Sequence, residues 1–141
     1  MMKRALFLAA ILAALLMLSS CQSNSTSSKF KDYKKTRSGI RYQVHKKGTG
    51  ETVGNRVNAT VHYRGTLLNG KEFDSSFRRG GPATFNIYKV IPGWTEVLKM
   101  MPEGSKWRVV IPPKLAYGKK GSGPIPPDST LIFDIQVLKY H

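Results

Sequence analysis

The segment Val90-Ile91-Pro92-Gly93-Trp94 holds the residue types from which a pocket for a small apolar ring can be built. Two β-branched residues run through a Pro-Gly turn into a tryptophan that begins a short predicted helix. The first N–H groups of a helix lack intrahelical partners, so the N–H of Ile91 can donate to a ligand carbonyl. The indole of Trp94 offers a large flat apolar surface. Alone, the segment is equally compatible with ordinary core packing.

The elements that must position this segment are mostly strands. From residue 40 onward, short apolar runs alternate with polar residues or are bounded by Gly, Pro and Asn, which is typical of half-buried antiparallel strands. The predicted strands are residues 40–44, 57–63, 71–75, 84–87, 106–111 and 130–138.

One segment has helical spacing instead. Trp94, Val97, Leu98 and Met101 fall at i, i+3, i+4 and i+7, and Pro102 follows at once. We therefore predict an α+β fold, in which a curved antiparallel sheet of five to six strands wraps around one short α-helix.

Six short motifs recur in an order that points to a known family. They are residues 63–67 (YRGTL), 69–76 (NGKEFDSS), 90–94 (VIPGW), 111–113 (IPP), 116–118 (AYG), and 125–127 (IPP) with 131–134 (LIFD). Together they resemble the FKBP family over about residues 38–141. The resemblance implies an FKBP-like fold and peptidyl-prolyl cis-trans isomerase activity. Residues 38–42 (SGIRY) are similar to the bacterial exported members in particular.

The resemblance also implies the residues of the site. They are Tyr63, Phe73, Asp74, Val90, Ile91, Trp94, Tyr117, Ile125 and Phe133. Trp94 would lie under the prolyl ring, the other apolar residues would form the walls, and Ile125 would close the lid. For each aromatic residue the alternative is plain core packing. Trp107 is assigned to the core.

The polar members of this set have separate expected roles. The N–H of Ile91 and the hydroxyl of Tyr117 would donate to substrate carbonyls. Asp74 would be a carboxylate at the rim that accepts a hydrogen bond from Tyr63 or binds a cation such as Arg79. The alternative for Asp74 is a turn residue that caps nearby N–H groups.

The chemistry implied needs neither a nucleophile nor a metal. Rotation about a peptide bond faces a barrier of about 18–20 kcal/mol, because twisting removes the amide resonance. A catalyst must hold the proline, remove water from the imide and favour the twisted state. His45, His62 and His141 are scattered without acidic or cysteine partners at ligand spacing, so we predict no metal and no cofactor.

Two departures from the family pattern affect the pocket walls. Ala83 follows Pro82 where many members carry a large apolar residue, and we expect Phe85 in the core. The loop over residues 118–127 is one residue shorter than in the best-known eukaryotic members. These changes should alter substrate preference and the affinity for macrolide inhibitors more than they remove the reaction.

The N-terminus predicts export. Residues 1–20 read as a secretory signal peptide, with Lys3 and Arg4 before an apolar run, and the alternative is an uncleaved anchor. Residues 18–21 (LSSC) resemble a bacterial lipobox, which makes Cys21 the lipidated first residue. Residues 21–37 would be a flexible basic tether before the isomerase domain, 38–141. Gln22 favours the outer membrane facing the periplasm, with the cell surface or plasma membrane as alternatives.

The formal net charge of +15 restricts the partners. An exported protein rarely meets nucleic acid, so anionic lipid headgroups are the better candidates, against the alternative of a solvated basic face. The expected substrates are proline-containing unfolded or extended polypeptides, and the expected state is a monomer. The alternatives to an isomerase are an FKBP-fold chaperone and a surface binding module with little isomerase activity.

Overall fold

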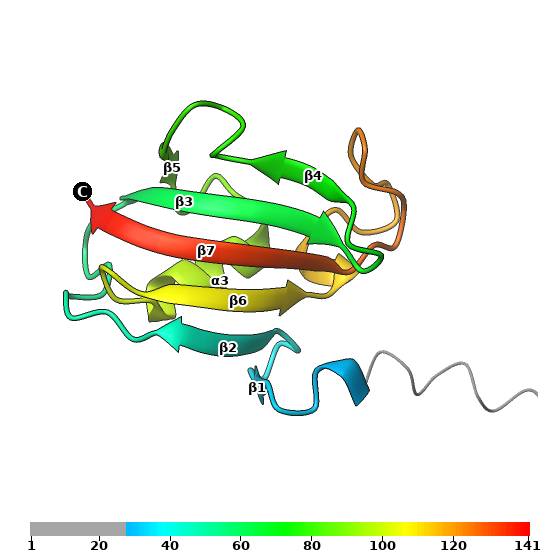
Figure 1. The fold of residues 1–141 in the computed structure, drawn as a ribbon, viewed down its shortest axis with the longest axis horizontal. Coiled ribbons are helices and arrows are strands. Elements are labelled where there is room, and N and C mark those ends of the chain that lie inside the picture. Colours follow the sequence, from blue (N-terminus) through cyan, green and yellow to red (C-terminus); the bar gives the residue numbers. More distant parts are fainter. Residues whose placement is uncertain (1–27) are drawn as a thin grey trace, which may run out of the picture. The chain divides into compact units, whose positions relative to one another are not determined.

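Antiparallel pairing joins seven strands into one sheet, in the order β1-β2-β6-β7-β3-β4, with β5 also paired to β3 (Figure 1). The strands are β1 (Lys34–Lys35), β2 (Arg41–Lys46), β3 (Asn58–Leu67), β4 (Glu72–Ser75), β5 (Ala83–Asn86), β6 (Lys106–Ile111) and β7 (Leu131–Tyr140). This is a computed structural model, and it describes residues 28–141. The predicted signal peptide, Cys21 and the first part of the tether lie outside the described residues.

Strand alternation determines which side chains face the core. β7 lies between β3 and β6, and Phe133, Ile135 and Val137 are buried while the residues between them are partly exposed. In the β3–β7 register Tyr63 is opposite Ile135, and Gly65 is opposite Phe133. The inner face of the sheet therefore presents Tyr63 and Phe133 side by side along two neighbouring strands.

The helix α3 (Pro92–Met100) covers this inner face and lies behind the sheet in Figure 1. Proline at its first position is favourable because that position needs no N–H donor. Gly93 allows a close approach, since a Cβ there would lie 2.5 Å from Cγ2 of Ile111. Trp94, Val97 and Leu98 are buried in the core, as the helical spacing predicts. A short 3₁₀ helix, η1 (Pro113–Leu115), follows β6.

The hydroxyl of Tyr140 holds the end of α3 against the sheet. It lies 2.6 Å from the carbonyl oxygen of Leu98 and 2.8 Å from that of Met101. The last carbonyls of a helix have no intrahelical donor, so this hydroxyl replaces one. The side chain comes from the last residue of β7, and it ties the C-terminal strand to the helix.

The predicted α+β fold is confirmed, and residues 33–141 contain one short α-helix and seven strands rather than the five to six expected. The additional strand is β1, whose residues were assigned to the flexible tether. Lys34 pairs with Tyr42 and Lys35 with Arg41, after a turn that requires Gly39 at a φ of 103°. Both lysine side chains are exposed, so no apolar alternation predicted this strand.

Residues 33–141 form one compact unit, and the described residues before them belong to a separate one. None of the helices in the described part of the chain is long and apolar enough to cross a membrane.

Candidate active site

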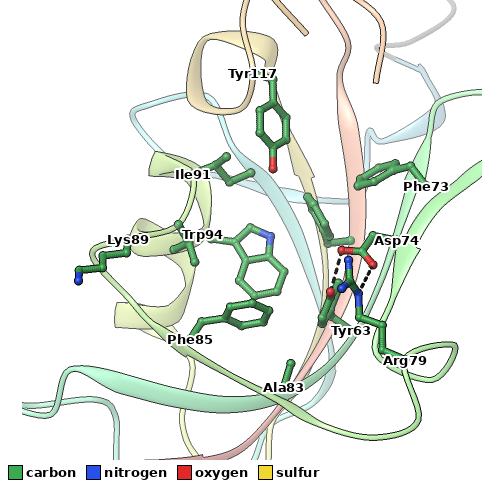
Figure 2. Close-up of a pocket in the computed structure, with 12 residues that line it drawn as sticks. Tyr63, Phe73, Asp74, Arg79, Ala83, Phe85, Lys89, Ile91, Trp94 and Tyr117 are labelled. Atoms are coloured by element: carbon green, nitrogen blue, oxygen red, sulfur yellow. Dashed lines mark hydrogen bonds and ion pairs between the residues drawn. The ribbon is translucent and has the colours of Figure 1, made fainter. Parts of the chain in front are cut away.

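A pocket of about 590 Å³ opens beside the first turn of α3 (Figure 2). Its lining comes from β3, β4, the segment between β4 and β5, β5 itself, β7, the segment before α3, α3 and the residues after η1. The residues that line it are Tyr63, Phe73, Asp74, Arg79, Ala83, Phe85, Lys89, Val90, Ile91, Trp94, Tyr117 and Phe133. Most of them are apolar or aromatic, which is typical of small-molecule and side-chain binding pockets.

Trp94 forms the floor of the pocket. Its side chain is only 4% exposed, and its ring meets three aromatic rings at nearly right angles. The centroid distances are 5.3 Å to Tyr63, 5.6 Å to Phe85 and 5.3 Å to Phe133. Edge-to-face contacts of this kind fix the orientation of the indole. Its buried Nε1 has no hydrogen-bond partner among residues 28–141.

Phe73 forms the wall next to Phe133. The two rings meet edge to face with centroids 5.5 Å apart. Gly65 makes this contact possible, because a Cβ there would lie 2.6 Å from Cζ of Phe73 and 2.8 Å from Cε1 of Phe133. The glycine of the YRGTL motif is therefore required by the packing of the pocket wall.

A charged cluster of Tyr63, Asp74 and Arg79 occupies one side of the pocket (Figure 2). Oδ2 of Asp74 accepts from the Tyr63 hydroxyl at 2.7 Å. Oδ1 accepts from Nε of Arg79 at 2.9 Å and from the N–H of Ser75 at 2.8 Å. The hydrogen bond from Tyr63 and the cation Arg79 that the sequence suggested for Asp74 are thus both present.

These contacts determine the protonation of the cluster. Burial alone would raise the pKa of Asp74, but hydrogen bonds from Arg79, Tyr63 and the Ser75 N–H lower it below its usual value. Burial, together with the hydrogen bond to the Asp74 carboxylate, raises the pKa of Tyr63 to about 12. Near neutral pH the carboxylate is ionised and compensated by Arg79, and Tyr63 keeps its proton.

Two hydrogen-bond donors remain available to a ligand. The N–H of Ile91 donates to no acceptor within the described part of the chain, while its carbonyl accepts from Trp94 at 2.9 Å. Tyr117 is 40% exposed, and Figure 2 shows its hydroxyl directed into the pocket. An apolar floor with a backbone donor and a hydroxyl donor above it can bind a ring that is flanked by carbonyl groups.

The structure brings together all but one of the predicted site residues. The exception is Ile125, which does not line the pocket and is 6% exposed within the core cluster. Its N–H donates to the carbonyl of Ser122 at 2.8 Å, and its carbonyl accepts from the Ser122 N–H at 3.0 Å. These two bonds fix the backbone of the loop at Ile125, and the role of its side chain in closing the lid stays a prediction.

Phe85 has a second environment that the sequence did not predict. It packs against the core, as expected, but it also lines the pocket and contacts the rings of Tyr63 and Trp94 edge to face. Ala83 lines the same wall two residues earlier on β5. The aromatic wall on this side therefore comes from Phe85. Lys89 also lines the pocket, and no signal in the sequence predicted it.

The described residues contain no cluster of side chains suited to bind a metal ion. Within residues 28–141 no three His, Cys, Asp or Glu side chains lie close enough to hold an ion. The three histidines bond to neighbouring polar side chains, His45 to Gln43, His62 to Ser76 and His141 to Thr60.

The fold and the pocket together define a class of protein. A curved antiparallel sheet over one helix, with an aromatic pocket at the helix start, is the architecture that the sequence motifs implied for FKBP-type proteins. A family model described as FKBP-type peptidyl-prolyl cis-trans isomerase matches residues 48–138. The chain belongs to this family.

Individual relatives agree with this assignment. The FKBP-type peptidyl-prolyl cis-trans isomerase FkpA of Escherichia coli K12 is 50% identical over 110 residues, covering 78% of this chain and 41% of the relative. Outer membrane protein MIP of Legionella longbeachae is 49% identical over 102 residues, covering 72% and 44%. The chain thus spans less than half the length of these curated relatives.

Solved structures show the same fold. The crystal structure of FkpA from Escherichia coli superposes with a TM-score of 0.76 at 39% identity, covering 94% of this chain and 65% of that one. A peptidyl-prolyl cis-trans isomerase from Pseudomonas syringae pv. tomato gives 0.74 at 34% identity and covers 94% of both chains.

Proposed function

We propose that this protein is a peptidyl-prolyl cis-trans isomerase that accelerates rotation about X-Pro bonds in exported polypeptides. The observation that carries the proposal is the pocket itself, in which Trp94 forms an apolar floor below two unused donors, the Ile91 N–H and the Tyr117 hydroxyl. The family membership and the FkpA relatives support it.

The geometry suggests how rotation is favoured. The prolyl ring rests on Trp94, and the aromatic walls remove water from the imide. The planar imide is more polar than the twisted one, so water stabilises the planar state more than an apolar pocket does. Transfer of the imide into the pocket therefore lowers the barrier to rotation. The Ile91 N–H and the Tyr117 hydroxyl hold carbonyls on the substrate chain while the bond rotates. Each 1.4 kcal/mol of preference for the twisted state gives about a tenfold faster rate.

Asp74 has a positioning role in this proposal. Its carboxylate is held by Tyr63 and Arg79, so its charge stays at a constant position at the pocket rim. A fixed negative charge there influences the polarity of the carbonyl that precedes the proline. No proton transfer is needed in the reaction.

A cis-to-trans assay on a proline tetrapeptide tests the proposal. The wild-type chain should accelerate isomerisation over buffer, and a macrolide of the FKBP-inhibitor class should reduce the rate. Trp94→Ala should lower kcat/KM more than tenfold, because the floor is lost. Tyr117→Phe should lower it about three- to tenfold, the scale of one hydrogen bond. Asp74→Ala should lower it through the loss of the fixed charge.

Circular dichroism of each variant separates loss of activity from loss of fold. Trp107→Phe is the matched control, since Trp107 is buried against Tyr42 and does not line the pocket. An unaccelerated rate with folded wild-type protein would exclude the enzyme and leave a chaperone or binding module with the same pocket.

We further propose that the protein is exported and lipid-anchored through Cys21. The basic start, the apolar run and the LSSC motif support this, as does the similarity to a relative named outer membrane protein. The part of the expected 21–37 tether that precedes the compact unit, residues 21–32, then acts as the tether. The basic charge of the chain adds attraction to anionic lipid.

Labelled fatty acid and membrane fractionation test the anchor. Wild-type protein should carry the label and sediment with the outer membrane, and Cys21→Ser should lose the label and become soluble. A label retained by the Cys21→Ser variant would contradict the proposal. If the wild-type protein sediments with the plasma membrane instead, the lipid anchor is supported but the outer-membrane location is contradicted.

A further inference from the structure

We propose that a groove beside the pocket, lined by Tyr88, Val90, Pro92, Thr95, Glu96, Lys99 and Met100, binds a second segment of the same substrate chain. The preferred segment carries an apolar side chain and a carboxylate a few residues from the proline. The proposal rests on the isomerase function proposed above and names a substrate class for it.

The groove lies next to the prolyl pocket. Val90 lines both of them, and Lys89 beside it lines the pocket. A substrate with its proline on Trp94 that leaves the pocket across Val90 therefore enters the groove directly. An extended chain advances about 3.3–3.6 Å per residue, so the groove is reached within a few residues of the proline.

The groove exposes an aromatic ring that the fold does not need for its core. Tyr88 is 59% exposed, although its backbone N–H donates to Oδ1 of Asn86 at 2.9 Å. Met100 also lines the groove and is partly buried against the core. An exposed tyrosine and a methionine in one groove are suitable contacts for an apolar side chain.

The charges around the groove favour an acidic segment. Lys99 places its ammonium 4.9 Å from the centre of the Tyr88 ring, and neither Lys99 nor Lys89 forms an ion pair with any residue of 28–141. Glu96 is the one carboxylate of the groove lining, and both its oxygens accept from the Ser38 hydroxyl, at 2.8 Å and 2.7 Å.

The prolyl pocket adds no opposing charge, because its carboxylate is already compensated. Asp74 is paired with Arg79 at 2.9 Å, which leaves Lys89 as the uncompensated charge of the pocket lining. Two unpaired lysines and one carboxylate thus flank the path of the substrate. A substrate carboxylate gains attraction from this excess of positive charge, and a substrate lysine is repelled by it.

Extended peptides test the groove with the full chain. Each peptide contains the same Ala-Pro core, with Leu-Glu-Glu, Leu-Lys-Lys or Gly-Ser-Ser added on one side or the other. We compare kcat/KM for each extended peptide with kcat/KM for the tetrapeptide. Leu-Glu-Glu on one side should raise kcat/KM about threefold or more, because one exposed ion pair and one apolar contact together have this scale. Leu-Lys-Lys should show no such gain.

Variants identify the source of the gain. Lys99→Glu should abolish the gain with Leu-Glu-Glu and create one with Leu-Lys-Lys, and Tyr88→Ala should reduce the gain with Leu-Glu-Glu. Lys139→Glu, at an exposed lysine on β7, should leave the ratios unchanged. Equal ratios for all three segments would overturn the groove proposal, while acceleration of the tetrapeptide would still support the isomerase.

Binding provides a readout that does not depend on catalysis. In ¹⁵N-labelled protein the Leu-Glu-Glu peptide should shift the amide signals of residues 88 and 99, and the tetrapeptide should not. Shifts confined to the prolyl pocket would overturn the proposal even if no peptide were isomerised.

Discussion

The Tyr63 hydroxyl donates to Oδ2 of Asp74 at 2.7 Å, and this bond joins β3 to β4 at the rim of the pocket. Arg79 binds the other carboxylate oxygen. The pocket therefore contains an ionised group whose position is fixed from two sides and whose charge is compensated.

This cluster predicts how activity depends on pH. The pKa of Asp74 is lowered in the folded protein, so its ionised form stabilises the fold at pH values above the pKa of the unfolded chain. This stabilisation is lost as the pH falls through the folded-state pKa. Tyr63, with a pKa raised to about 12, keeps its proton throughout the neutral range. We expect kcat/KM to be constant from about pH 5 to 9 and to decline only below about pH 4.

A pH profile of the tetrapeptide assay measures this, with Asp74→Asn as the comparison. The variant should have lower activity and should lose the acid decline. A midpoint near pH 6 that disappears in Asp74→Asn would show that the carboxyl is not held ionised as the contacts require.

Truncation of Phe85 should weaken substrate binding more than it weakens the fold. Phe85→Ala removes the edge contacts to Tyr63 and Trp94, so the pocket widens on the side where Ala83 already leaves space. We expect KM to rise several-fold, measured with the tetrapeptide. Phe77→Ala is the control, since Phe77 is 65% exposed and stacks on His62 away from the pocket lining. A similar KM for both variants would contradict the assignment of Phe85.

Addition of one methyl group at the start of α3 should destabilise the protein. Gly93→Ala places a Cβ 2.5 Å from Cγ2 and 2.9 Å from Cδ1 of Ile111, and the helix cannot move without shifting Trp94. Overpacking of this kind reduces the free energy of unfolding by about 1–3 kcal/mol. Urea denaturation measures it against Gly81→Ala, where a Cβ meets nothing within 4 Å. Equal midpoints for the two variants would refute the close approach.

Removal of the Tyr140 hydroxyl should loosen the junction between β7 and α3. Tyr140→Phe leaves the carbonyls of Leu98 and Met101 without this donor, at a cost of about 1–2 kcal/mol in unfolding free energy. Tyr42→Phe is the matched control, because it keeps the stacked ring contact with Trp107 at 4.8 Å. If thermal and urea unfolding show equal loss in both variants, the hydroxyl has no special role at the helix end.

The sequence predicted the helix and the central strands because their apolar periodicity is strong. Trp94, Val97 and Leu98 face the core in the structure, as their helical spacing requires. The pocket residues were predicted through the family motifs, since no periodicity distinguishes a pocket wall such as Phe73 from a core residue. Their proximity in space follows from the β3–β7 register, which a single sequence does not reveal.

The sequence is least informative where an apolar residue has two environments within reach. Phe85 lies on the short strand β5, which pairs only with β3, and its ring faces the pocket as well as the core. Ile125 lies in a loop that its backbone bonds to Ser122 hold, and it is 6% exposed within the core cluster. Apolar periodicity in a single sequence does not separate a pocket wall from the core at either position.

The different surroundings of the two tryptophans give the protein an optical probe of its own. Trp94 is enclosed by three aromatic rings in the pocket, whereas Trp107 is stacked on Tyr42 outside the pocket lining, and neither indole N–H has a hydrogen-bond partner within residues 28–141. Indole emission depends on the polarity around the ring. In a Trp107→Phe background the remaining tryptophan fluorescence comes from Trp94, and its change on titration reports occupancy of the pocket without a label.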